Sequence, residues 1–331
     1  MNYYFIGIKG TGMAALACML HDLGNAVSGS DLERHFFTEE PLRKRHIAIV
    51  PFDPKNIQDG MHVIIGNAFL EDFPEVVAAR ANHTCVCARY HEFVGQFLKK
   101  YRTIAVSGSH GKTTTTGMMA ALFSHVVPTG WLIGDGSGHI AEDTVYFALE
   151  ADEFQRHFLA YHPAYAVITN VDLDHVDYFH DEADYRLAYE AFSYQVSKGI
   201  FLWGEDEEGR KLKLNPHVPI IRYGESEKDD LQAVHVEERS DGMDFDVLFH
   251  KEYVGHFSLP FVGHHLLLNS LACIGVGLAE GFTALQIEEG LSAFQGVKRR
   301  FVVKTVGENV YIDDYAHHPT EVKVTINAAH N

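Results

Sequence analysis

A glycine-rich segment between an apolar strand and a helix constrains this chain more than any other feature. Residues 103–106 predict a buried strand, and residues 108–111 supply two glycines before Lys112 and Thr113. Glycines let the backbone wrap a phosphate, and the helix start adds partial positive charge. Lys112 can reach the β- and γ-phosphates, and the Thr113 hydroxyl suits Mg²⁺. The usual spacing has a glycine where Val106 stands, so the loop is a shortened variant; the alternative is a structural turn with a solvated lysine.

Two further segments lie at the carboxyl ends of strands that we expect to lie beside this loop. Residues 145–149 predict an apolar strand that ends at Glu150, and a carboxylate at that edge of a parallel sheet can hold Mg²⁺ beside phosphates. The predicted strand at 165–169 leads to His175 among carboxylates, a set that suits a second divalent cation or a phosphate contact. Each segment alone is also compatible with a solvated polar loop.

A second glycine turn lies near the start of the chain. It follows a predicted strand at residues 3–8 and precedes an apolar helix, and an acidic residue stands about 20 residues later, as in dinucleotide folds whose acid contacts a ribose. The order of glycines is not GxGxxG, and the spacing does not decide between NAD, a UDP-sugar and a purely structural turn. The candidate substrate-binding residues are Gly10, Thr11, Gly12, Met13, Ser30 and Asp31.

The alternation of strands and helices predicts an α/β fold. A Rossmann-like parallel sheet is expected over residues 1–98, and a phosphate-loop mononucleotide-binding α/β domain with added short strands over residues 99–298. Residues 299–331 contain one predicted strand and one predicted helix, which cannot bury a core by themselves. We therefore expect this segment to be the start of a truncated C-terminal domain.

Net charge and cysteine content limit the classes of binding partner and the cellular compartment that we expect. The chain has 27 Lys and Arg against 45 Asp and Glu, a net charge of −18, which disfavours nucleic-acid and anionic-membrane surfaces. Four cysteines without a paired motif favour a reducing compartment, and no run of 18 apolar residues occurs. The sequence predicts a soluble cytoplasmic protein without membrane insertion, and it leaves the oligomeric state open.

The chain contains six segments that fit one family pattern, at residues 5–13, 108–116, 150–153, 169–177, 296–301 and 312–321. Together, and in this order, they resemble the Mur ligase family of peptidoglycan precursor synthesis. The resemblance implies a three-domain carbon–nitrogen ligase whose first domain binds the UDP part of the substrate and whose central domain binds ATP. It implies that L-alanine is joined to the lactyl carboxylate of UDP-N-acetylmuramate through an acyl phosphate, with ATP as co-substrate and Mg²⁺ as cofactor.

The resemblance also implies roles for single residues. Thr113 and Glu150 would hold one Mg²⁺, and Glu150 with His175 a second. Arg300 or Arg299, together with His317, would face the phosphates or the incoming amino acid. The implied catalytic residues are Lys112, Glu150, His175, Arg300 and His317. The implied ATP-binding residues are Gly108, Ser109, His110, Gly111, Lys112, Thr113, Thr114 and Asn269.

One position departs from the family pattern. The helix that contacts adenine usually reads Gly-x-His-Asn-x-x-Asn, whereas Leu266 stands at the first Asn and Asn269 at the second. Without the rest of a third domain, we expect the chain to bind UDP-N-acetylmuramate and to ligate weakly or not at all.

Other functions compete with the alanine-adding activity. The alternatives are a non-catalytic UDP-sugar-binding fragment and a recycling ligase that attaches a ready-made peptide to the same sugar nucleotide. Residues 10–13 favour the alanine-adding activity over the recycling ligase. An NAD-dependent oxidoreductase would leave the loop at 108–116 without a purpose.

Overall fold

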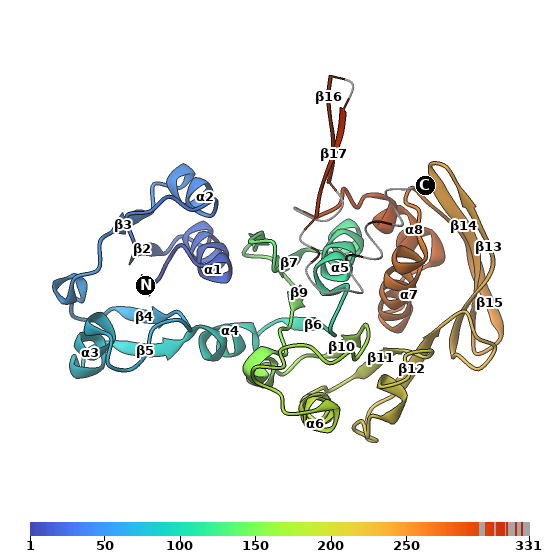
Figure 1. The fold of residues 1–331 in the computed structure, drawn as a ribbon, viewed down its shortest axis with the longest axis horizontal. Helices are drawn as coiled ribbons and strands as arrows, with labels where there is room; N and C mark the ends of the chain where they lie inside the picture. The colour runs from blue at the N-terminus through green and yellow to red at the C-terminus, as the bar shows by residue number, and fades with distance from the viewer. Residues whose placement is uncertain (298–301, 308, 315, 317–321, 323–325, 327–331) are drawn as a thin grey trace. The chain divides into compact units, whose positions relative to one another are not determined.

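Strands and helices alternate along the chain, and the strands assemble into sheets. The computed structural model describes residues 1–297, 302–307, 309–314, 316, 322 and 326. Their strands form a five-stranded sheet, a ten-stranded sheet and a two-stranded hairpin (Figure 1). The predicted α/β class is confirmed. None of the helices in the described part of the chain has the length and apolar character needed to cross a bilayer.

The first sheet is parallel throughout. Its elements are β1 (Asn2–Ile6), α1 (Thr11–Asp22), β2 (Ala26–Ser30), α2 (Glu39–Lys44), β3 (Ala48–Val50), the 3₁₀ turn η1 (Pro54–Asn56), β4 (His62–Ile65), α3 (Pro74–Ala81), β5 (Val86–Arg89) and α4 (Tyr90–Leu98). The strand order is β3-β2-β1-β4-β5. Because β1 is central, four of its five residues are buried, as expected for a parallel strand covered on both faces.

One face of this sheet packs against α3. Tyr4 and Ile6 of β1 join Val63 and Ile65 of β4 in an apolar cluster with Val76 of the helix. The two-residue spacing in each strand puts these side chains on one face. The helix begins with proline, whose missing N–H costs nothing at a first helical position. The helix predicted at 74–81 is therefore confirmed.

The second sheet mixes parallel and antiparallel strands. Its elements are β6 (Arg102–Ser107), α5 (Lys112–Val126), β7 (Thr129–Leu132), β8 (Gly138–His139), β9 (Tyr146–Glu150), the 3₁₀ segment η2 (Phe154–Ala160), β10 (Tyr165–Ile168), α6 (Glu182–Ser193), β11 (Gly199–Trp203), η3 (Gly209–Lys211), β12 (Ile220–Gly224), β13 (Leu231–Arg239), β14 (Gly242–Phe249), β15 (Glu252–Leu259), α7 (His264–Ala279) and α8 (Ala284–Ser292). The order is β15-β14-β13-β12-β11-β10-β6-β9-β7-β8. Strands β6, β10, β11 and β12 pair in parallel, whereas β13, β14 and β15 form the added antiparallel strands.

The chain divides into two compact units that interleave in sequence. The first unit comprises Met1–Thr103, Pro128–Leu149 and Ala160–His162; the second comprises Ile104–Val127, Glu150–Leu159 and Pro163–Asn331. The first unit thus contains β7 and β8, which follow the glycine loop in sequence. Strand β8 contacts α1, and a Cβ added at Gly138 would lie 2.9 Å from Met19 Sδ. In the second unit, β16 (Val302–Val306) and β17 (Asn309–Asp313) form an antiparallel hairpin.

Candidate active site

The glycine loop connects β6 to α5 within the second unit. Gly108 and Gly111 have φ angles of 128° and 83°, a region that side chains rarely adopt. A Cβ at Gly108 would also lie 2.1 Å from Thr169 Oγ1, so this position requires glycine for space as well. Gly111 is the N-cap of α5 and, as a glycine, supplies no side-chain cap to the helix start. The first backbone N–H groups of α5 can therefore bind an anion.

The segment after β10 holds the loop in this conformation. Asn170 Oδ1 accepts a hydrogen bond from the His110 N–H at 2.9 Å, and Thr169 Oγ1 donates to the His110 carbonyl at 2.5 Å. The Ser109 N–H donates to the Asn170 carbonyl at 3.1 Å, and Ser109 Oγ donates to the Asp172 carbonyl at 2.6 Å. Since protein groups already order the loop, a ligand would bind with little further ordering cost.

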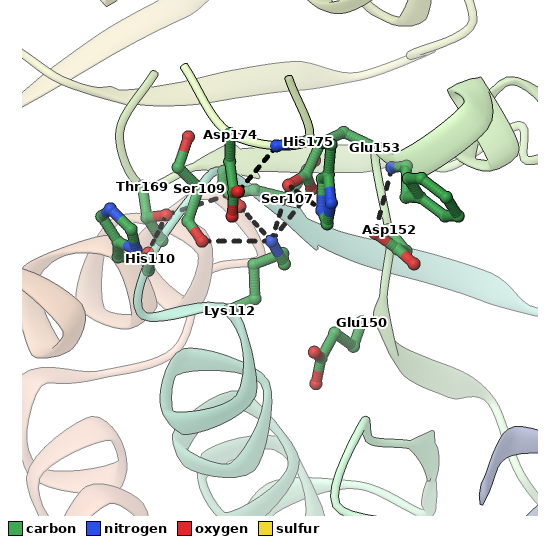
Figure 2. A network of polar contacts seen from close by, with 12 residues as sticks. Ser107, Ser109, His110, Lys112, Glu150, Asp152, Glu153, Thr169, Asp174 and His175 are labelled. Atoms are coloured by element: carbon green, nitrogen blue, oxygen red, sulfur yellow. Dashed lines mark hydrogen bonds and ion pairs between the residues drawn. The ribbon is translucent and has the colours of Figure 1, made fainter. Parts of the chain in front are cut away.

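The Lys112 ammonium points back over the loop toward a buried carboxylate (Figure 2). Its Nζ lies 2.9 Å from both carboxylate oxygens of Glu153, which is fully buried. It also donates to the carbonyls of Gly108 at 2.5 Å and Ser109 at 3.2 Å. Burial alone would lower the pKa of Lys112, but the charges of Glu153 and Asp152 outweigh it and raise the pKa. The ammonium therefore remains charged.

Tyr185 of α6 links Glu153 to the loop. Its hydroxyl donates to Glu153 Oε1 at 3.3 Å and lies 2.9 Å from Ser109 Oγ and 3.2 Å from the Tyr189 hydroxyl. Burial, followed by the charge of Glu153, raises the pKa of Tyr185, so the hydroxyl keeps its proton. Sequence reasoning assigns no role to Tyr185; the available signal is its place on the buried face of an amphipathic helix.

The two oxygen ligands predicted for the first Mg²⁺ lie together. Thr113 Oγ1, on the first turn of α5, donates to Glu150 Oε1 at 3.1 Å. Glu150 is the last residue of β9. Hydroxyl and carboxylate oxygens are the ligands that Mg²⁺ prefers. This pair could therefore hold the ion next to the loop.

His175 lies with a different carboxylate from the one predicted. Its Nε2 is 3.8 Å from Glu153 Oε1, and ligand atoms of His175, Asp152 and Glu153 all lie within 4.8 Å of one another. Figure 2 shows Glu150 apart from this group. His175 has a φ of 53°, unusual for a residue with a side chain, so its surroundings determine its conformation. The three side chains are a second candidate cation site.

The remaining residues predicted to bind ATP lie on or near α5. Asn269 of α7 is buried against the loop, because a Cβ at Gly111 would lie 3.1 Å from Asn269 Oδ1. Thr114 is half-buried on α5, and Leu266 is half-buried at the start of α7. The predicted residues Arg300 and His317 lie outside the described residues.

The predicted substrate-binding turn lies in the first unit. Gly10 is the N-cap of α1 and likewise supplies no side-chain cap to the helix start. A Cβ at Gly7, where φ is 84°, would lie 2.2 Å from the Phe69 ring. A Cβ at Gly12 would lie 2.4 Å from the Tyr90 hydroxyl oxygen. These glycines therefore let two aromatic side chains approach the backbone. Of the neighbouring candidates, Thr11 is half-buried and Met13 is buried.

Ser30 and Asp31 contact protein groups of the same unit. Asp31 Oδ2 accepts from the Lys9 N–H at 2.7 Å, and its Oδ1 accepts from the Leu32 N–H at 2.8 Å. Ser30 Oγ donates to the buried carboxylate of Glu75. These contacts tie the turn to the end of β2, and a role of either side chain in substrate binding stays a prediction.

Lys9 is a buried cation of this turn. Its Nζ donates to the carbonyls of Leu32 at 2.6 Å and Arg34 at 2.8 Å, and it lies 2.7 Å from Glu39 Oε1. Lys9 and Glu39 are both buried. The hydrogen bond from Lys9 outweighs burial and lowers the pKa of Glu39 from 4.5 to about 2.

The loop at the carboxyl edge of parallel strands gives the second unit the architecture typical of mononucleotide-binding α/β proteins. Comparison of the sequence with known protein families identifies the chain more specifically than its fold does. Residues 106–277 match the Mur ligase middle domain, and residues 2–102 match the Mur ligase family catalytic domain. The chain belongs to the Mur ligase family, as its motifs predict.

Individual relatives share nearly the whole chain. UDP-N-acetylmuramate–L-alanine ligase from Pediococcus pentosaceus is 49% identical over 99% of this chain and 74% of its own length. The crystal structure of UDP-N-acetylmuramate-alanine ligase from Thermotoga maritima has a TM-score of 0.83 at 29% identity, covering 99% of this chain and 77% of that one. The structure of a UDP-N-acetylmuramate:L-alanyl-gamma-D-glutamyl-meso-diaminopimelate ligase from Neisseria meningitides has a TM-score of 0.79 at 26% identity, covering 90% and 99%.

Proposed function

We propose that this chain is an ATP-dependent ligase that joins L-alanine to the lactyl carboxylate of UDP-N-acetylmuramate. The observation that carries the proposal is the glycine loop with Lys112 above it and the Thr113–Glu150 pair beside it. The substrates are proposed from the relatives, of which the one from Pediococcus is 49% identical. We also propose a cytoplasmic location, because ATP is the co-substrate and the four cysteines are free thiols.

The first step activates the carboxylate, which is a poor acylating agent. A lactyl carboxylate oxygen attacks the γ-phosphorus of ATP, the bond to the β-phosphate oxygen breaks, and ADP leaves. Two anions must approach each other in this step, and they repel. The Lys112 ammonium and the uncapped start of α5 would reduce that repulsion, since fixed positive groups stabilise charge that gathers in a transition state.

The second step forms the amide. The neutral amine of L-alanine attacks the acyl carbon, the carbon–oxygen bond to phosphate breaks, and inorganic phosphate leaves. The amine nitrogen loses a proton as the amide forms. Since phosphate is a good leaving group, this step needs no further nucleotide.

The donor set beside the loop fits Mg²⁺. The Thr113 hydroxyl and the Glu150 carboxylate, 3.1 Å apart, would hold one ion, and Asp152, Glu153 and His175 would hold a second cation. Bound Mg²⁺ would neutralise phosphate charge.

The first unit would bind the UDP part of the substrate. The uncapped start of α1, preceded by Gly10, supplies backbone N–H groups of the kind that bind a diphosphate. Ser30 and Asp31 lie at the end of β2, the edge at which such sheets bind nucleotides. Thr11, Gly12 and Met13 form the first turn of α1, so they would lie closest to the diphosphate.

Two measurements test the proposal. Calorimetric titration with UDP-N-acetylmuramate should give binding, whereas NADH should not bind. ADP release should require ATP, Mg²⁺, UDP-N-acetylmuramate and L-alanine together, and mass spectrometry should detect the alanyl product. Binding of the sugar nucleotide without ADP release would instead indicate a non-catalytic binder. Product formation with a ready-made peptide and none with L-alanine would indicate a recycling ligase.

A further inference from the structure

We infer that Glu153 is a competing counter-ion, which the phosphates of the nucleotide must displace from Lys112. The inference rests on the nucleotide binding proposed above and goes beyond it, because it assigns a positioning role to a residue outside the predicted set. The two carboxylate oxygens of Glu153 lie at equal distances of 2.9 Å from Lys112 Nζ. The carboxylate therefore occupies the side of the ammonium that an anion would take.

The Lys112 ammonium already has enough acceptors for all its donors. It has three N–H bonds, and four oxygens of the described residues lie within hydrogen-bond distance: two of Glu153 and the carbonyls of Gly108 and Ser109. A phosphate oxygen can therefore bind Lys112 only if one of these contacts is given up. Glu153 is the charged acceptor among them, and charge-assisted hydrogen bonds are the stronger ones. Its affinity for Lys112 sets how easily the ammonium turns to the nucleotide.

Glu153 cannot turn to solvent when Lys112 leaves. Its side chain has no exposed surface, and the Tyr185 hydroxyl contacts Oε1 at 3.3 Å. Apart from Lys112, the basic side chain placed next to it among the described residues is His175, whose Nε2 lies 3.8 Å from Glu153 Oε1. A buried carboxylate that loses its cation is costly. Nucleotide binding is therefore weaker than it would be with a neutral group at this position.

The substitution Glu153→Gln removes the negative charge of the side chain but keeps its shape. Glutamine has the same length, its amide oxygen can still accept from Lys112, and its amide nitrogen can donate. The variant therefore keeps the packing near Tyr185 but releases the ammonium more easily. We expect nucleotide to bind about tenfold more tightly, which corresponds to about 1.4 kcal/mol. A residue that only supports the fold would give the opposite result, weaker binding.

The first experiment measures binding of ATP in the presence of EDTA. Without divalent cations, any effect of Glu153 on a metal is absent. Calorimetry should give a dissociation constant about tenfold lower for Glu153→Gln than for the wild type. The matched control is Glu207→Gln, which removes a carboxylate 3.5 Å from Lys211 on the surface and should leave the affinity unchanged. A folded Glu153→Gln protein with equal or weaker affinity would overturn the inference.

A further readout distinguishes competition from structural support. In a double-mutant cycle, Lys112→Met should destabilise the wild type more than the Glu153→Gln variant, because only the wild type retains an unpaired charge. Additive effects would contradict the pairing.

The two proposals can fail separately. If the wild type binds no ATP, the proposed function and the inference fall together. If the wild type binds ATP and Glu153→Gln does not bind it more tightly, the inference alone falls.

Discussion

Two lysines, one in each glycine turn, have the same kinds of partners. Lys9 contacts the buried Glu39 and two backbone carbonyls, and Lys112 contacts the buried Glu153 and two backbone carbonyls. The difference lies in where those carbonyls are. Those of Lys9 belong to residues 32 and 34, beyond β2, whereas those of Lys112 belong to its own loop.

This difference separates a lysine that supports the fold from one that we propose to bind phosphate. Lys9 connects its turn to a segment more than twenty residues away, so its departure would release that segment. Lys112 can leave Glu153 while residues 169–172 still hold the loop. The two lysines have the same kinds of partner residues, although Lys112 is the more exposed of the two, with 14% of its side chain accessible against 5% for Lys9. What distinguishes the two lysines is where their partner residues lie along the chain.

The largest expected effect is the loss of turnover in Lys112→Ala. Without the ammonium beside the phosphates, kcat should fall by about 10³-fold, the scale for removing a preorganised electrostatic group. Affinity for UDP-N-acetylmuramate should not change, because that ligand is assigned to the first unit. ADP release and calorimetry measure the two quantities. Lys211→Ala, a surface change, is the control. Loss of both turnover and sugar-nucleotide affinity would contradict the division of roles.

Lys9→Met should act on stability instead. It leaves Glu39 buried with Arg43 as its remaining cation, so the free energy of unfolding should fall by about 3 kcal/mol. Urea denaturation measures the change, and Lys44→Met, which breaks an exposed ion pair with Glu40, is the matched control. Wild-type stability combined with lost turnover would place Lys9 among the functional lysines and remove the distinction.

The same pair predicts a loss of stability in acid. The pKa of Glu39 is lowered from 4.5 to about 2, so the pair stabilises the fold fully above pH 4.5 and progressively less as the pH falls toward 2. The loss cannot exceed the effect of removing the pair. Unfolding free energies at several pH values should show it in the wild type and much less in Lys9→Met. Equal slopes in the two proteins would argue against the coupling.

Glu150→Gln should raise the Mg²⁺ requirement of the reaction. The Thr113–Glu150 pair loses its negative charge, and half-maximal activity should need about tenfold more Mg²⁺. Activity titrations at saturating ATP measure this. Glu289→Gln, an exposed carboxylate that pairs with His125, should behave as the wild type. An unchanged Mg²⁺ titration would remove Glu150 from the proposed metal site.

The smallest effect is expected for Asp31→Ala. Two backbone N–H groups lose their acceptor, at a cost of about 1 kcal/mol in unfolding free energy. The exposed Asp72→Ala serves as control. If affinity for UDP-N-acetylmuramate fell while stability did not, Asp31 would act on the ligand, as the sequence predicts, and not on the turn.

Much of the fold is predictable because strong patterns mark it. The helix at 74–81 begins with proline and has apolar spacing, and the strands beside the glycine loop are continuous apolar runs. The sequence does not predict strands β3 and β7, because each is short and β7 contains a glycine. Helix α8 carries a capping box from Thr283 to Gln286, a signal that the sequence does contain.

The site is predictable only in part. The proximity of Thr113 and Glu150 follows from topology, since Glu150 ends β9 and Thr113 begins the helix that follows the neighbouring strand β6. The pairing of Glu153 with Lys112 does not, because Glu153 follows β9 in an irregular turn. There, Gln155 and Arg156 have φ angles of 49° and 58°, which no pattern indicates. Side-chain partners in such turns depend on tertiary packing rather than on periodicity.

The interleaved units have a consequence for synthesis. The first unit includes Pro128–Leu149, so β8 cannot contact α1 until those residues have been made. At about 5–20 residues per second, a ribosome takes roughly 2–9 s to proceed from Thr103 to Leu149. During that time the surface of α1 that β8 later covers is exposed on the nascent chain. A gene fragment cut at the end of α4 would keep that surface exposed permanently, so the first unit should be expressed with its later segment rather than as a simple N-terminal piece.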